Sequence, residues 1–201
     1  MSIDLKLTEV APREMRLGSV ISFHGKASEC YEKCLNKGMR MRDRSFSQCG
    51  GCSSSTAFVL DSSIQDVAIV LHAPIGCAGD FSGQSYLLIL GSMSRGQRVH
   101  NVKAICTNLD ENDTVYGAGD KLRYAIQEAY TRFSPKAILV HTSCVSGIIG
   151  EDMESITDEM EGELGIPVSP VYCEGFRSKI WSTGFDATSH AIVRKVIKPV
   201  A

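Results

Sequence analysis

Eight cysteines are the residues of this 201-residue chain best suited to chemistry, and they occupy positions 30, 34, 49, 52, 77, 106, 144 and 173. Thiolates bind soft metals and iron–sulfur clusters, whereas disulfides are rare in a reducing compartment. Cysteines also serve as small buried hydrophobic residues. We therefore expect some of the eight to ligate a metal centre and others only to pack.

Cys49 and Cys52 form a Cys-x-x-Cys motif directly before a predicted helix that begins at Ser53. The amino terminus of a helix lowers the pKa of a thiol and offers free N–H groups to the sulfides of a cluster. A redox-active pair normally follows a strand, and no strand is predicted here. Structural zinc usually takes two close pairs, and the second would have to be Cys30 and Cys34. Zinc therefore stays open as the alternative to a cluster.

Helices and short apolar strands alternate after this motif, which is typical of a parallel sheet covered by helices on both faces. The predicted strands span 66–71, 102–106, 137–141 and 167–171, and the predicted helices span 53–64, 121–133 and 153–164. We predict an α/β fold, a three-layer Rossmann-like domain over residues 49–201. An irregular leader at 1–48, with one short helix near 29–35, precedes it.

The positions of the predicted strand ends separate candidate metal ligands from structural cysteines. Ligands of an open α/β sheet bind outside the carboxyl ends of its strands. Cys77, Cys144 and Cys173 each follow a predicted strand, so all three should lie at one edge of the sheet. This placement favours metal ligation over packing for Cys77 and Cys144. Cys106 lies at or inside its strand, which is more typical of a structural residue.

Glycines gather in the same loops. Gly76 and Gly79 lie on either side of the first candidate ligand, and Gly147 and Gly150 follow the second. A bulky inorganic group needs backbone without side chains close by, and amides that point at its sulfur atoms. Any one of these glycines also suits an ordinary turn, but their repetition favours a cofactor-binding role for Gly76, Gly79 and Gly147.

Composition and charge exclude several classes of protein. Hydrophobic residues make up 43% of the chain and charged residues 22%, as in soluble globular proteins. The net charge of −2 gives no electrostatic reason for a nucleic-acid or anionic-membrane partner. No apolar run reaches the roughly 18 residues of a membrane span, and early acidic residues stand where a secretory signal would be basic. We expect a cytoplasmic protein.

Four segments resemble, in order and at similar spacing, the amino-terminal domain of nitrogenase component 1 α chains. They are HAPIGC at 72–77, DENDTVYG at 110–117 with the Lys-Leu pair at 121–122, TSCVSGIIGED at 142–152, and CEGFR at 173–177. The match extends from about residue 49 to residue 190. Its last segment resembles the α-like branch of the family more than the β-like branch.

The resemblance implies that Cys52, Cys77 and Cys144 supply one subunit's share of an iron–sulfur cluster, with Cys49 as the alternative to Cys52. The cluster would be of the P-cluster type, 8Fe-7S, or a 4Fe-4S cluster, at the interface with a β-like nitrogenase subunit. It would pass electrons from an ATP-dependent iron protein reductase to an active site for a small-molecule substrate. The chain is then one component of a nitrogenase-like oxidoreductase.

Departures from the family pattern bear on the substrate. Members that reduce dinitrogen have Arg, Gln and His where this chain has Ser85, Trp181 and Phe185. Loss of the imidazole removes a proton donor, so we do not expect the usual dinitrogen reduction. Glu174 and Arg177 are kept, and the resemblance implies that they position the cofactor or its neighbours. A salt bridge or cap at a helix entry explains this pair equally well.

Family α chains also continue far beyond residue 201 with domains that hold an iron-molybdenum or iron-type cofactor. We therefore expect an amino-terminal fragment that is inactive alone. Three functions are open: a subunit of a reductase that acts, for example, on carbon–sulfur compounds as methylthio-alkane reductases do, a non-catalytic scaffold on which a nitrogenase cofactor is assembled, or a zinc-stabilised α/β binding domain.

Overall fold

The computed structural model describes residues 26, 28, 29, 32, 52–79, 81–176 and 183–197. The chain divides into two compact units, Met1–Arg44 and Ser45–Ala201. In the first unit the described residues 28, 29 and 32 are helical. The rest of the predicted leader, with Cys30 and Cys34, lies outside the described residues, so the leader stays a prediction.

The second unit carries the predicted alternation of helices and strands. Its elements in chain order are α3 (Ser53–Ser62), β1 (Val67–His72), α4 (Ile75–Ala78), α5 (Phe81–Ser94), β2 (Ala104–Cys106), α6 (Glu111–Tyr116), α7 (Gly119–Phe133), β3 (Ala137–Thr142), α8 (Cys144–Ile149), α9 (Met153–Leu164), β4 (Val168–Val171), α10 (Thr183–Ala191) and the π-helical turn η1 (Ile192–Val196). All four predicted strands and all three predicted longer helices are present, with ends shifted by a few residues.

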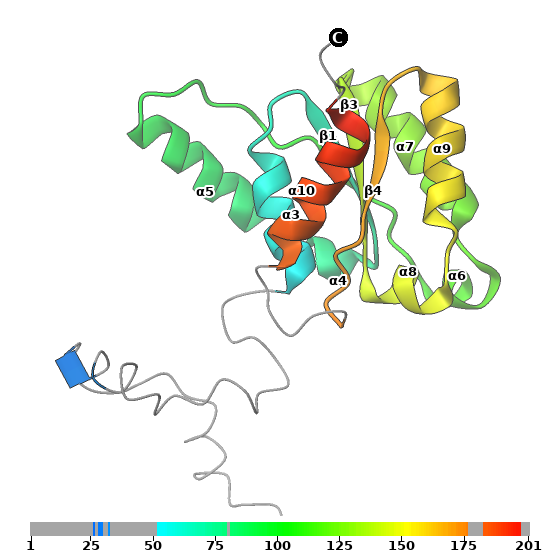
Figure 1. Cartoon of the computed structure of the whole chain (residues 1–201), viewed down its shortest axis with the longest axis horizontal. Helices are drawn as coiled ribbons and strands as arrows, with labels where there is room; N and C mark the ends of the chain where they lie inside the picture. Colours follow the sequence, from blue (N-terminus) through cyan, green and yellow to red (C-terminus); the bar gives the residue numbers. More distant parts are fainter. Residues whose placement is uncertain are drawn as a thin grey trace, which may run out of the picture. The chain divides into compact units, whose positions relative to one another are not determined.

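The four strands form one parallel sheet in the order β2-β1-β3-β4. The central pair is β1 with β3, in a register that places Val67 opposite Ala137 and His72 opposite Thr142. Because all strands run the same way, their carboxyl ends meet at one edge, where α4, α6 and α8 gather (Figure 1).

Helices cover both faces of this sheet. On one face, α7 and α9 pack on the side chains of Ala68, Val70, Ile138, Val140 and Val168, all of them buried. On the other face, α3, α10 and η1 pack on Val67, Ala137, Leu139 and Val171. The two sets alternate along each strand, as the pleat requires. The prediction of a three-layer α/β fold with a parallel sheet is confirmed.

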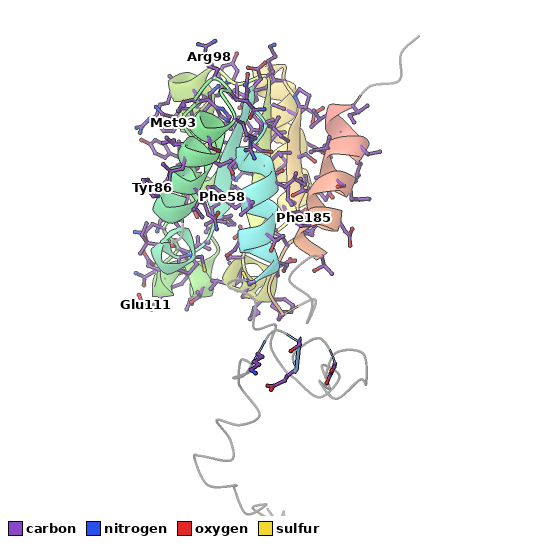
Figure 2. The ribbon with its side chains drawn as sticks, turned by 90° about the vertical axis from the view of Figure 1, so that its left-hand side faces the viewer. Phe58, Tyr86, Met93, Arg98, Glu111 and Phe185 are labelled. Atoms are coloured by element: carbon purple, nitrogen blue, oxygen red, sulfur yellow. The ribbon has the colours of Figure 1, made fainter. Side chains whose placement is uncertain are left out.

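Helix α5 leaves several large apolar side chains in solvent. Tyr86 is 62% exposed, Leu87 61% and Met93 63%, and Figure 2 shows Tyr86 and Met93 on this helix. Among the described residues, no helix combines the length and the apolar character needed to cross a membrane.

Candidate metal centre

Two of the predicted ligands follow the two central strands. The chain leaves β1 at His72 and reaches Cys77 on α4, and it leaves β3 at Thr142 and reaches Cys144, the first residue of α8. Strand β2 joins β1 on one side and β3 joins it on the other. This reversal of strand order is the topological switch point at which α/β sheets bind ligands.

The third predicted ligand, Cys52, meets Cys144 at the backbone of Gly175. A Cβ atom placed on Gly175 would lie 3.5 Å from Cys144 Sγ and 3.8 Å from Cys52 Sγ. The two sulfur atoms therefore border the same small volume. Cys52, Cys77 and Cys144 are all exposed free cysteines, so each thiol is accessible to a group bound at this end of the sheet.

The start of α3 is held in place by contacts with the carboxyl end of the domain. Cys52 occupies the N-cap position of α3, and the hydroxyl of Ser53 donates to the carbonyl oxygens of Cys173 at 2.8 Å and Glu174 at 3.3 Å. Gly184 of α10 lies so close that a Cβ there would collide with the Ser53 carbonyl oxygen and lie 2.7 Å from Ala57 N. The backbone that follows Cys52 is thus tied to two other segments.

The turn that carries Cys144 is held by a reciprocal cap. Ser143 and Ser146 are buried; the Ser143 N–H donates to Ser146 Oγ at 2.8 Å, and the Ser146 N–H donates to Ser143 Oγ at 3.2 Å. These bonds satisfy backbone groups that a helix start leaves unpaired. They orient the first turn of α8 and so the Cys144 thiol.

The three glycines predicted to bind a cofactor have different surroundings. A Cβ on Gly147 would lie 2.8 Å from Cγ of the buried Glu174, so that space already holds a side chain. A Cβ on Gly76 would meet no heavy atom within 4 Å in the described part of the chain, and one on Gly79 would lie 3.3 Å from the Gly76 carbonyl oxygen. Of these three glycines, only Gly76, one residue before Cys77 on α4, has open space where a side chain would lie among the described residues.

Two other cysteines bond to backbone. Cys173 is buried and donates to the Thr142 carbonyl oxygen at 3.4 Å, while Cys106 donates to the Ala73 carbonyl oxygen at 3.2 Å. Burial raises the pKa of both thiols and so disfavours the thiolate that binds metal. Cys173 follows β4 at the sheet edge as predicted, but its thiol is buried. Cys106 lies inside β2, where the sequence predicted a structural residue. Cys49, Arg177 and Trp181 lie outside the described residues.

The exposed thiols are accessible to a bound metal group. Among the described residues, no three His, Cys, Asp or Glu side chains are arranged to hold one metal ion. A cluster distributes its thiolates over several iron atoms, and it needs accessible sulfurs with unobstructed backbone between them. Cys52 and Cys144, separated by Gly175, meet that requirement.

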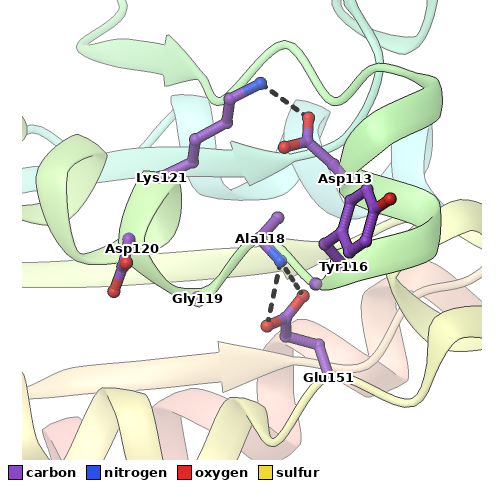
Figure 3. A pocket seen from close by; sticks show the side chains of 8 residues that line it. Asp113, Tyr116, Ala118, Gly119, Asp120, Lys121 and Glu151 are labelled. Carbon is purple, nitrogen blue, oxygen red and sulfur yellow. Dashed lines mark hydrogen bonds and ion pairs between the residues drawn. The ribbon is translucent and has the colours of Figure 1, made fainter.

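Sequence reasoning missed a polar cleft beside α8. It is lined by Asp113, Tyr116, Gly117, Ala118, Gly119, Asp120, Lys121 and Glu151. Figure 3 shows Lys121 paired with Asp113 at 2.6 Å and Glu151 accepting from the Ala118 N–H at 3.1 Å. Behind the cleft, the fully buried His72 lies 3.5 Å from Glu151 Oε2. Burial lowers the pKa of His72, and the Glu151 carboxylate only partly offsets this.

Comparisons with known proteins identify related sequences. Over 127 residues the chain is 35% identical to the nitrogenase iron-molybdenum cofactor biosynthesis protein NifE of Nostoc sp., covering 63% of this chain and 25% of that protein. Over 148 residues it is 35% identical to the nitrogenase molybdenum-iron protein alpha chain of Methanosarcina barkeri, covering 73% of this chain and 27% of that protein.

A solved structure matches the fold. The structure described as Nitrogenase Cp1 at pH 5 superposes with a TM-score of 0.60 at 30% identity, covering 72% of this chain and 29% of that chain. The chain thus spans less than a third of the length of these relatives. A family model, Nitrogenase component 1 type Oxidoreductase, matches residues 52–201. The chain therefore belongs to the nitrogenase component 1 type oxidoreductase family.

Proposed function

We propose that this chain is part of an α-like subunit of a nitrogenase-type reductase, and that Cys52, Cys77 and Cys144 hold its share of an iron–sulfur cluster. The observation that carries the proposal is the meeting of Cys52 and Cys144 at Gly175, at the end of the sheet where Cys77 also lies. A β-like subunit would supply the remaining ligands. Cys49 stays the alternative to Cys52.

The cluster would receive electrons from an ATP-dependent iron protein and pass them to an active-site cofactor. The residues of this chain would fix the position of the cluster and tune its potential through thiolates and burial. Exposed apolar side chains at the same end of the sheet support contact with a partner protein: Tyr116 is 85% exposed, Val115 72% and Ile148 76%. They lie on α6 and α8, which contact each other.

The substrate is proposed to be a small molecule other than dinitrogen. The family's usual histidine is replaced by Phe185, which lies on α10 and is 38% exposed. A phenyl ring neither donates nor accepts a proton, so a route of proton delivery used by dinitrogen-reducing members is absent at this position.

A second candidate is a scaffold on which a nitrogenase cofactor is assembled. It is favoured by the 35% identity to a NifE protein, equal to the identity to a molybdenum-iron protein alpha chain. An ATP-dependent electron-transfer assay with the iron protein separates the two candidates. A reductase subunit turns over substrate in this assay, whereas a scaffold holds or transfers cofactor without turnover.

The ligand assignment is tested by measuring iron and acid-labile sulfide after anaerobic co-expression of the chain with its β-like partner. We expect both elements in the wild-type complex and a clear loss of both in Cys77→Ala. Cys106→Ala is the matched control, because its thiol bonds to backbone, and it should keep its iron. Unchanged iron in Cys77→Ala, or zinc without iron and sulfide in the wild type, would contradict the proposal.

A further inference from the structure

Two buried histidines lie at or next to the carboxyl ends of the two central strands. Each lies close to a carboxylate on the segment that carries, or directly follows, another of the predicted ligands. His72 ends β1, which leads to Cys77, and its Nε2 lies 3.5 Å from Glu151, just past the helix of Cys144. His141 lies in β3, which leads to Cys144, and its Nε2 lies 2.5 Å from Asp61 on the helix that begins after Cys52.

The two pairs lie on opposite faces of the sheet. His72 follows Val70 by two positions and so shares its face, which is covered by α7 and α9. His141 follows Leu139 in the same way and shares the face covered by α3 and α10. The central strands are therefore linked to the segments around the thiols from both sides.

Each pair is part of a small network. On one face, Thr107 Oγ1 lies 3.2 Å from His72 Nδ1, and the Ala118 N–H donates to Glu151 at 3.1 Å. A consistent assignment has the Thr107 hydroxyl donating to Nδ1 and the Nε2–H donating to the carboxylate. This network joins β1, the start of α7 and the end of α8.

On the other face, the Thr188 hydroxyl of α10 donates to the same oxygen of Asp61 that bonds His141, at 3.2 Å. The side chains of Asp61 and His141 are fully buried. In the described part of the chain, Asp61 Oδ1 and His141 Nδ1 have no hydrogen-bond partner. Burying such a pair costs desolvation that apolar residues of similar volume would avoid, so stability alone does not account for it.

We propose that His72–Glu151 and His141–Asp61 are positioning pairs that set the spacing of the three cysteine-bearing segments. The first sets Cys77 relative to Cys144, and the second sets Cys52 relative to Cys144. The inference rests on the proposed function, because it gives these pairs the task of holding thiols at the separations that a cluster requires. Groups that orient metal ligands in this way alter metal affinity about 10–100-fold when removed.

The test measures two separations in the metal-free chain, Cys77 to Cys144 and Cys52 to Cys144, in variants of each pair. Spin labels are placed on Cys77 and Cys144, or on Cys52 and Cys144, with the other cysteines replaced by serine, or by alanine at the buried Cys173. Glu151→Ala should abolish the defined dipolar broadening of the first pair of labels and leave the second unchanged. Replacing both His141 and Asp61 by leucine should do the reverse.

Conservative and control variants distinguish the loss of a positioning contact from a general loss of structure. Glu151→Gln keeps an acceptor for the His72 ring and should restore the separation lost in Glu151→Ala. Glu128→Ala removes an exposed carboxylate that pairs with Arg132 on α7 and should change neither separation. If Glu151→Ala does not fold, replacement of both His72 and Glu151 by leucine takes its place.

Iron content of the same variants, measured in the complex with the β-like partner, gives the functional readout. We expect about a tenfold or greater loss of iron affinity in Glu151→Ala and recovery in Glu151→Gln. Separations that do not change, or that change together in every variant, would overturn the inference. A wild-type complex without iron would instead overturn the proposed function, and the label separations would still decide the role of the two pairs.

Discussion

Gly175 lies beside two of the predicted ligands. Its missing side chain leaves open the space beside Cys52 and Cys144, and an added Cβ would lie only 3.2 Å from Cys52 Cβ. Such a contact is closer than apolar atoms prefer. A side chain at this position would compete for space with any group bound by both sulfurs.

We predict that Gly175→Val lowers the iron affinity of the complex by about tenfold or more, as other changes beside metal ligands do. Gly162→Val is the matched control, because a Cβ at that position on α9 meets no described atom within 4 Å. Iron and acid-labile sulfide per chain provide the measurement. Full iron content in Gly175→Val would show that the volume between the two sulfurs is not used.

At the scale of elements, the approach of α10 to α3 places the start of α3 against the sheet. The two helices meet backbone to backbone at Gly184, and Thr188 reaches Asp61 one turn further along α10. Close approach of this kind needs a residue without a side chain on one helix.

We predict that Gly184→Ala lowers the free energy of unfolding by about 1–3 kcal/mol, because the added methyl group overlaps backbone that is held in place by the sheet. Gly83→Ala on α5, where a Cβ has open space, should be neutral or stabilising by about 0.5–1 kcal/mol. Urea unfolding of both variants gives the comparison. Equal midpoints for Gly184→Ala and the wild type would refute the predicted overlap.

The sequence predicted those elements that have a clear hydrophobic period or a clear end. Helix α7 has apolar residues at helical spacing and ends at Ser134, which adopts a left-handed conformation with φ 45°. Helix α9 ends at Gly165 with φ 68°. Helix α5 mixes apolar and polar residues without a helical period, and α4, α6 and α8 are too short to show one.

The site was only partly predictable for a related reason. The order of strands and loops places Cys77, Cys144 and Cys173 at one edge, but it does not say which way a side chain turns after its strand ends. Cys173 turns inward because the Thr142 carbonyl oxygen accepts from its thiol. Likewise, the closeness of Gly147 to Glu174 joins residues far apart in the chain, which no local pattern encodes.

At the scale of the whole molecule, His72 links stability to pH. Burial keeps its ring neutral in the folded chain and lowers its pKa from 6.5. Below about pH 6.5 the unfolded chain binds a proton at this residue and the folded chain does not. The contribution of the neutral, buried His72 ring to the free energy of unfolding is therefore fully present above this pH. It is lost as the pH falls toward the folded-state pKa of His72.

We predict a lower free energy of unfolding at pH 5.5 than at pH 7.5, with a smaller difference in His72→Asn. Each unit by which the folded-state pKa is lowered corresponds to about 1.4 kcal/mol at full effect. His190→Gln, at an exposed position on α10, is the control and should keep the wild-type difference. An identical difference in His72→Asn would show that another group is responsible.

The pairing of β1 with β3 has a consequence for the synthesis of the protein. A chain that leaves the ribosome amino end first presents β1 and the Cys77 loop before β3, which ends at Thr142, has been made. Parallel pairing between distant segments forms slowly, and an unpaired apolar strand is a binding site for chaperones in the meantime. Cys77 and Cys144 reach their final surroundings only after β3 has joined β1. If these thiols hold a cluster as proposed, iron would be delivered to the folded domain rather than to the nascent chain.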